Sequence, residues 1–214
     1  VMFASILPEA IRDCKGVIID CDKRIPTLLE RSFPEAEAVY PTSDINDPFP
    51  WIANHKVDAR LAMGSLMHFN RKKADDFPKV PYLKADPERR KKWRKILDAM
   101  GPGKHVAISY AGGLKKTRQD QRSINPEKLV DFLKVEGIHW HSIQYHGWGA
   151  DNAAVLGTKA GVPFHHWHDV IMDWEEWAAF LSEVDLLITV NTSVHHLAGS
   201  LGVRQWCLTP KYVA

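Results

Sequence analysis

Short apolar runs alternate with amphipathic segments through the second half of the chain. The runs are nearly continuous in apolar residues, which is typical of strands that are covered on both faces of a parallel sheet. The segments between them place apolar residues at helical spacing. We therefore predict strands at residues 105–110, 138–145, 162–167, 185–190 and 204–208, separated by helices at residues 88–100, 125–134, 149–160, 173–181 and 193–201.

The first half follows the same alternation over fewer elements. Its pattern predicts helices at residues 2–14 and 25–33, strands at residues 16–21 and 36–40, and a helix or turn within residues 58–70. Strands that alternate with helices indicate an α/β layer structure. A proline-rich stretch then separates the halves, so we expect a domain at residues 1–78, a linker at residues 79–87 and a second domain at residues 88–214.

Several helix ends carry capping residues. Asn125 precedes Pro126, an N-cap followed by proline at the first helical position. Asp173 stands three residues before Glu176, which is the spacing of a capping box. These signals fix where two of the second-half helices should begin.

Composition limits the classes of function. The 214 residues are 45% hydrophobic and carry a net charge of +2, which is globular composition without the excess charge of a nucleic-acid-binding protein. The basic run at residues 88–95 has an apolar side and is expected to be a solvated helix face. No apolar run reaches the roughly 18–20 residues of a membrane span. The three cysteines, Cys14, Cys21 and Cys207, have no disulfide or zinc spacing and suit a reducing cytoplasm.

A glycine-rich basic loop follows the predicted strand at residues 105–110. Gly112 and Gly113 allow the backbone to turn sharply and approach a ligand. Glycines followed by cations and a helix start suit a phosphate group, although the spacing is not that of a P-loop. A mobile basic surface loop remains the alternative. The cations of this loop are Lys115, Lys116, Arg118 and Arg122.

A second polar turn follows the strand at residues 185–190. Asn191, Thr192 and Ser193 stand where that strand gives way to the helix at residues 193–201, and His196 lies one turn into the helix. Free N–H groups at a helix start, with hydroxyls beside them, favour an anion. Because both loops follow strands of one sheet, we expect them to share a pocket that holds a diphosphate.

The histidines allow other interpretations. Adjacent His195 and His196 point about 100° apart on a helix, so they do not readily bind one metal ion. We expect His195 to pack or to lie at the surface, and His196 could also be a structural hydrogen-bonding residue. Metal sites usually combine histidine with carboxylate or thiolate at a defined spacing. We therefore predict no metal site in the other cluster, which is His165, His166 and His168.

The segment at residues 185–208 resembles the donor site of GT-B glycosyltransferases. The match runs through Asn191-Thr192-Ser193, the His-Leu-Ala-Gly stretch at residues 196–199 and the Leu-Gly pair at residues 201–202. It is most similar to bacterial glycosyltransferase-like proteins that follow tetratricopeptide repeats. These are related to ADP-heptose:lipopolysaccharide heptosyltransferases and, more distantly, to O-GlcNAc transferases. Segments near residues 2–11, 18–36, 81–94, 107–123 and 142–147 agree in order.

The resemblance implies two Rossmann-like domains, the first of them incomplete, and a metal-independent transfer of sugar from a nucleotide-diphosphate donor to a glycan, a lipid-linked sugar or a protein. It implies catalytic roles for Arg122 and His196, and no cofactor beyond the donor. Electrostatic stabilisation of the departing diphosphate would then drive the reaction. The donor-binding residues implied by position are Gly112, Gly113, Lys116, Ser123, Gln144, Asn191, Thr192 and Ser193.

Two departures keep other functions open. Asn191 stands where the family often has aspartate, and relatives carry a glycine-rich turn with the candidate acceptor base just before the segment that begins this sequence. We therefore expect a fragment of a longer protein. A non-catalytic scaffold with the same fold is the main alternative. A nucleotide-sugar epimerase and a histidine-based hydrolase are weaker ones.

Overall fold

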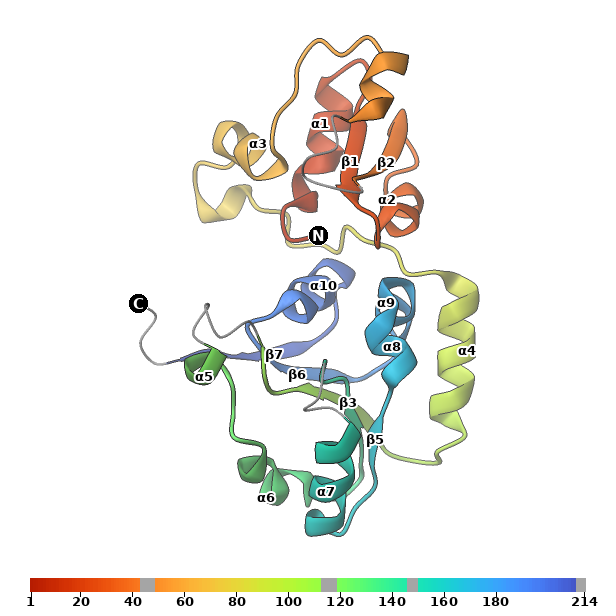
Figure 1. Cartoon of the computed structure of the whole chain (residues 1–214), viewed down its shortest axis with the longest axis vertical. Coiled ribbons are helices and arrows are strands. Elements are labelled where there is room, and N and C mark those ends of the chain that lie inside the picture. Colours follow the sequence, from red (N-terminus) through yellow and green to blue (C-terminus); the bar gives the residue numbers. More distant parts are fainter. Residues whose placement is uncertain (43–48, 113–118, 146–149, 211–214) are drawn as a thin grey trace.

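Two parallel sheets organise the chain in the computed structural model, which describes residues 1–42, 49–112, 119–145 and 150–210 (Figure 1). The smaller sheet pairs β1 (Ile18–Asp22) with β2 (Ala38–Thr42). Around it lie η1 (Ala4–Ile6), α1 (Leu7–Asp13), α2 (Pro26–Ser32), η2 (Pro50–Asn54), α3 (Met63–Asn70) and η3 (Ala74–Asp76). Pro26 occupies the first turn of α2, as its fixed φ favours.

The larger sheet has five strands in the order β5-β4-β3-β6-β7, all parallel. Its strands are β3 (Lys104–Ser109), β4 (Ile138–Ser142), β5 (Phe164–His166), β6 (Leu186–Val190) and β7 (Gln205–Leu208). Its helices are α4 (Pro87–Asp98), α5 (Gln119–Arg122), η5 (Pro126–Leu129), α6 (Val130–Leu133), α7 (Ala150–Ala160), α8 (His168–Met172), α9 (Trp174–Leu181) and α10 (Ser193–Leu201). The predicted α/β alternation is confirmed.

Alternation along the strands divides the core in two. Val106 and Ile108 face the cluster that contains α6 and α7, whereas Ala107 faces the cluster that contains α9 and α10. Successive strand side chains point to opposite faces, so an unbroken apolar strand must bury both. Helices accordingly cover both faces (Figure 1). The chain forms a smaller unit around the sheet of β1 and β2 and a larger unit around the five-stranded sheet. The apolar cluster on the α9 and α10 face continues through Leu83 to α2 and so joins the two units in one core.

Both predicted N-caps form, but the reciprocal bond from Glu176 that would complete the predicted capping box does not. Asn125 Oδ1 accepts from the Glu127 N–H at 3.0 Å, and Asp173 Oδ1 accepts from the Glu175 N–H at 2.8 Å. Glu176 does not return a bond to its own helix start. Its carboxylate accepts from Trp93 Nε1 at 2.6 Å and from the Arg89 guanidinium at 2.7 Å. A buried indole N–H needs an acceptor, and this demand outweighs the local cap.

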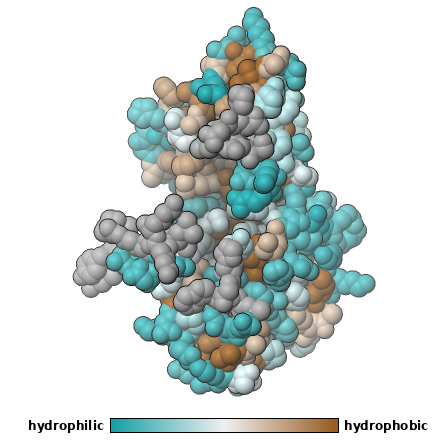
Figure 2. Space-filling view, viewed as in Figure 1, coloured by the Kyte–Doolittle hydropathy of each residue, from teal (hydrophilic) through white to brown (hydrophobic). Residues whose placement is uncertain are grey.

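The basic helix α4 presents a solvated face, as predicted. Figure 2 shows a hydrophilic surface along the side of the molecule where Figure 1 places α4. Its cations also bind carboxylates of the neighbouring helix and the turn that follows it. Arg90 and Arg94 both bind Glu183, which is almost fully buried. The positive charge of the basic run is therefore partly neutralised by neighbouring carboxylates.

The segment between the two units is held by the end of α10. The backbone N–H groups of Tyr82 and Leu83 both donate to the Ser200 carbonyl, at 2.9 and 3.0 Å. Gly202 ends the helix with φ +75°, and a Cβ there would lie 2.4 Å from Pro81 Cγ. This glycine therefore serves a helix end that lies against Pro81. Gly199 is exposed, and a Cβ there would lie 3.1 Å from Gln205 Nε2 of β7.

No helix in the described ranges combines the length and the apolar character that crossing a membrane requires.

A stack of histidines crosses β3 and β4. His141 is fully buried, accepts from Trp167 Nε1 at 2.9 Å through Nδ1, and lies 3.0 Å from His105 Nδ1 through Nε2. Because Nδ1 accepts, the His141 proton must sit on Nε2 and point at His105. Burial, with smaller contributions from His105 and His165, lowers the pKa of His141 to about 3. The ring is therefore neutral in the folded state across the physiological range.

This lowered pKa predicts acid sensitivity. The unfolded chain takes up a proton on His141 below its ordinary pKa of 6.5, whereas the folded chain does so only near 3. Stability should therefore fall as the pH drops from about 6.5, by up to about 1.4 kcal/mol per pH unit from this residue. His141→Asn, whose Oδ1 can replace Nδ1, should flatten the pH dependence of urea unfolding between pH 7 and pH 4. His68→Asn, at an exposed position of α3, should leave the slope unchanged. Equal slopes in all three proteins would contradict the assignment.

Candidate functional site

The strand order reverses between β3 and β6. The chain runs from β3 outward through β4 to β5, then returns to β6 on the other side of β3 and continues to β7. Ser109 at the end of β3 is in register with Thr189 of β6. Ligands of open parallel sheets bind outside the carboxyl ends of the strands at such a reversal. The two loops singled out by the sequence follow these two strands.

The two loops are in contact. A Cβ built on Gly112 would lie 2.2 Å from Thr192 Cγ2, so only glycine fits beside this threonine without movement. The next atoms it would meet, Thr192 Cβ and Val190 Cγ2, are at 3.6 and 3.7 Å, which is ordinary contact. The predicted convergence of the β3 and β6 loops is therefore confirmed at Gly112 and Thr192.

Thr192 precedes α10 without capping it. Its backbone is extended, and no side chain caps the first turn of the helix that begins at Ser193. The Thr192 Oγ1 atom is buried and has no hydrogen-bond partner within the described part of the chain. Asn191 is exposed at the end of β6. The first N–H groups of α10 thus remain available for an anion, with a hydroxyl beside them.

Ser123 ties the far end of the first loop back to its start. Its Oγ accepts from the Gly112 N–H at 3.3 Å and donates to the Gln119 carbonyl at 2.7 Å. Arg122, the last residue of α5, is partly buried next to it. This places Arg122 on the segment that returns to Gly112. The predicted ligand-binding residues Gly113 and Lys116, and the neighbouring cations Lys115 and Arg118, lie outside the described residues.

Gln144 holds the start of the same loop. It lies two residues beyond β4, which ends at Ser142, earlier than the predicted strand. The buried Oε1 accepts from the Tyr110 and Ala111 N–H groups at 2.9 and 2.8 Å, and Nε2 donates to the Ala111 carbonyl at 2.8 Å. The side chain thus fixes the backbone that leads into Gly112. Its contact with a donor stays a prediction.

A cavity of about 280 Å³ lies between the two units. Ser193 and His196 of α10 form one wall with Trp174 of α9. On the opposite wall are Asp22, the last residue of β1, and Arg24 in the turn that follows. Figure 1 shows the first residues of the chain directly above α10. Of the two predicted catalytic residues, His196 lines this cavity, whereas Arg122 is not among the described residues that line it.

His196 is half-buried and neutral. Burial, followed by the neighbouring His195, lowers the pKa of His196 below its ordinary value. A neutral imidazole can donate one hydrogen bond and accept another, but it contributes no positive charge at neutral pH. His195 points elsewhere, because its Nδ1 lies 2.9 Å from Gln205 Oε1 of β7. His195 is half-buried and bonded to β7, which agrees with the expectation that it packs or lies at the surface.

The sequence reasoning missed Asp22, Arg24 and Trp174. Asp22 is the last residue of β1, so the rule that selected residues beyond β3 and β6 would also have selected it. This rule could not select Trp174, because that residue is the first of helix α9 and does not follow a strand. The packing of the two units brings Asp22 and Arg24 to the α10 terminus, whereas Trp174 reaches it from α9 of the same unit.

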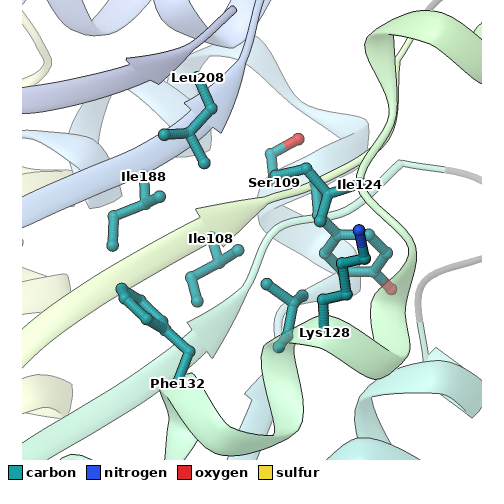
Figure 3. Close-up of a pocket in the computed structure, with 9 residues that line it drawn as sticks. Ile108, Ser109, Ile124, Lys128, Phe132, Ile188 and Leu208 are labelled. Carbon is teal, nitrogen blue, oxygen red and sulfur yellow. The ribbon is translucent and has the colours of Figure 1, made fainter. Parts of the chain in front are cut away.

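A second cavity, of about 170 Å³, lies on the other face of the larger sheet (Figure 3). Ile108, Ile188 and Leu208 come from three neighbouring strands, and Phe132 and Lys128 from the helices opposite. The lining is mostly apolar, and no residue from the start of α10 is among the described residues that line it. We therefore assign the candidate functional site to the cavity between the units.

Among the described residues, no group of three or more His, Cys, Asp and Glu side chains could hold a metal ion. His165 and His166 lie on β5, where His166 Nδ1 is 3.2 Å from Ser142 Oγ, and His168 begins α8.

Comparisons with known proteins agree with this architecture. No protein-family model matches the chain. It is 29% identical over 224 residues to Protein FlbA of Caulobacter vibrioides, covering 98% of this chain and 37% of FlbA. The chain thus spans little more than a third of the curated relative that it matches.

The crystal structure of the glycosyl transferase family 9 protein from Veillonella parvula DSM 2008 superimposes with a TM-score of 0.68. The match covers 99% of this chain and 78% of that chain at 10% sequence identity. At 10% sequence identity, this structural similarity is evidence for the fold alone. The chain therefore has a GT-B-like fold of Rossmann-like α/β units, as the sequence predicted.

The contact between Gly112 and Thr192 gives a direct test of the converging loops. Gly112→Ala should destabilise the protein by about 1–3 kcal/mol, because the new methyl overlaps Thr192 Cγ2. Adding Thr192→Ser removes that methyl and should restore most of the loss. Thr192→Ser alone is the control. Urea unfolding measures all three variants, and a double mutant no more stable than Gly112→Ala would show that the two loops do not touch.

Proposed function

We propose that this chain is the bulk of a glycosyltransferase that uses a nucleotide-diphosphate sugar and needs no metal ion. The observation that carries the proposal is the contact of Gly112 with Thr192 at the strand-order reversal, beside a cavity that reaches Ser193 and His196. The GT-B-like fold supports it, since the structural relative is titled a glycosyl transferase. The resemblance of residues 185–208 to donor sites points in the same direction.

The chemistry requires that negative charge be stabilised. An acceptor hydroxyl attacks the anomeric carbon and gives up its proton to a general base. The bond from that carbon to the phosphate oxygen breaks, and the nucleoside diphosphate leaves with the bonding electrons. In our proposal, the first N–H groups of α10 and the hydroxyls of Thr192 and Ser193 bind the leaving group. Lys116 and Arg122 supply positive charge, and neutral His196 donates a hydrogen bond rather than a charge.

A binding protein without transferase activity is the second candidate. Asn191 favours it, because an exposed amide at the end of β6 cannot accept a proton as a carboxylate could. Both candidates predict nucleotide binding. Only the transferase predicts that a donor sugar is consumed by the complete protein.

Nucleotide binding is the first expected result. UDP, ADP or GDP at ten times its dissociation constant should stabilise the protein by about 1.4 kcal/mol, which raises Tm by about 3–6 °C. Differential scanning fluorimetry measures this shift. The corresponding nucleoside monophosphates should produce a smaller shift, because they lack the second phosphate that the α10 terminus would bind.

Two variants locate the effect. His196→Ala and Arg122→Ala should abolish most of the Tm shift, whereas His195→Ala should keep it. His195 is a matched control because it is adjacent to His196 but contacts Gln205. If no diphosphate shifts the melting temperature of the complete protein at millimolar concentration, the proposed function is wrong.

A further inference from the structure

Arg24 crosses from the smaller unit to the larger one. It stands in the turn between β1 and α2, and its guanidinium carbon lies 5.6 Å from the centre of the Trp174 ring. Trp174 is the first residue of α9 in the larger unit. A guanidinium over an indole face is attracted by the ring's negative face. The contact directs the arginine side chain along the boundary between the units, where it stays largely exposed.

Asp22 holds the same guanidinium from the other side. Arg24 Nε donates to Asp22 Oδ1 at 2.8 Å, and the terminal NH2 group donates to Oδ2 at 2.9 Å. The side chains are 60% and 47% exposed, so the ion pair is solvated and separating it costs little. Arg24 is thus oriented by a partner that it can leave.

Within the described part of the chain, the wall formed by α10 contributes no cationic side chain. Ser193 and His196 line that wall, and the lowered pKa of His196 keeps its ring neutral near pH 7. Among the described residues, Arg24 is the only cationic side chain that lines the cavity. The cavity, at about 280 Å³, has room for several water molecules of about 30 Å³ each. An anion in it would therefore meet the α10 terminus on one side and Arg24 on the other.

We propose that Arg24 is a phosphate ligand that the smaller unit supplies to the donor diphosphate, turning from Asp22 to the phosphate oxygens when the anion occupies the cavity. The inference rests on the proposed function and deepens it, because the anion is the same leaving group. The planar guanidinium can bind two phosphate oxygens at once, as it now binds two carboxylate oxygens.

This geometry makes donor binding depend on both units. A phosphate bound only by α10 would interact with the larger unit alone, whereas one that also binds Arg24 holds the two units together. Asp22 competes with the phosphate for Arg24. Removal of the Asp22 charge should therefore strengthen diphosphate binding, but only while Arg24 is present.

Isothermal titration of the complete chain with ADP, UDP and GDP tests the assignment. Arg24→Gln should weaken binding of the best nucleotide about tenfold, the loss expected for one charge-assisted contact. Arg24→Lys should recover part of it, and Asp22→Asn should bind more tightly than the wild type. The double mutant Asp22→Asn/Arg24→Gln should bind like Arg24→Gln. Arg12→Gln is the matched control, because Arg12 also binds a neighbouring carboxylate, Asp13, on α1 and outside the cavity.

The outcomes separate the two proposals. If the wild type binds none of the three diphosphates, the proposed function fails and this inference fails with it. If the wild type binds and Arg24→Gln binds equally well, the inference alone fails. A gain in Asp22→Asn that persists fully in the double mutant also overturns it, because Asp22 would then act by repelling the anion directly. Urea unfolding without nucleotide checks that each variant is folded, and Arg24→Lys gives the answer if Arg24→Gln is not.

Discussion

The candidate site depends on one packing constraint, the contact between the loops that leave β3 and β6. β3 and β6 are neighbours because the strand order reverses after β5, when the chain returns to the other side of β3. Their carboxyl ends therefore meet, and Gly112 has no room for a side chain beside Thr192. Gln144 accepts from the Ala111 N–H and Ser123 accepts from the Gly112 N–H, and together they hold the backbone there. A loop with a Cβ at this position would have to move away from the start of α10.

The same constraint sets the electrostatics of the site. The loop contact brings the uncapped start of α10 to the edge of the sheet, where Ser193 and His196 face the smaller unit. Burial lowers the pKa of His196, so this wall offers dipoles and hydrogen bonds rather than charge. Among the described residues that line the cavity, the cationic side chain that faces this wall is Arg24 of the other unit. Because the residues that line the cavity come from both units, the geometry of the site depends on how the units pack.

The packing of the units is itself extensive. One apolar cluster extends from α2 through Leu83 to α9 and α10, and Arg31 of α2 binds Glu175 of α9 beside it. The linker is further fixed by two backbone bonds to the Ser200 carbonyl at the far end of α10. The helix that begins at the candidate site therefore ends on the segment that joins the units. A ligand that moved this helix would also act on the linker.

The sequence by itself determined the α/β alternation, most element positions and the two loops of the site. These features are local, because apolar periodicity, capping residues and glycines act within a few residues of each other. It also selected Thr192, Ser193 and His196 correctly as residues at one helix start. It misjudged Glu176, whose partner Trp93 is 83 positions away, and it missed Arg24 and Trp174. Only the tertiary structure decided those roles, because they arise where segments distant in sequence are packed together and a buried or solvated partner outweighs the local pattern.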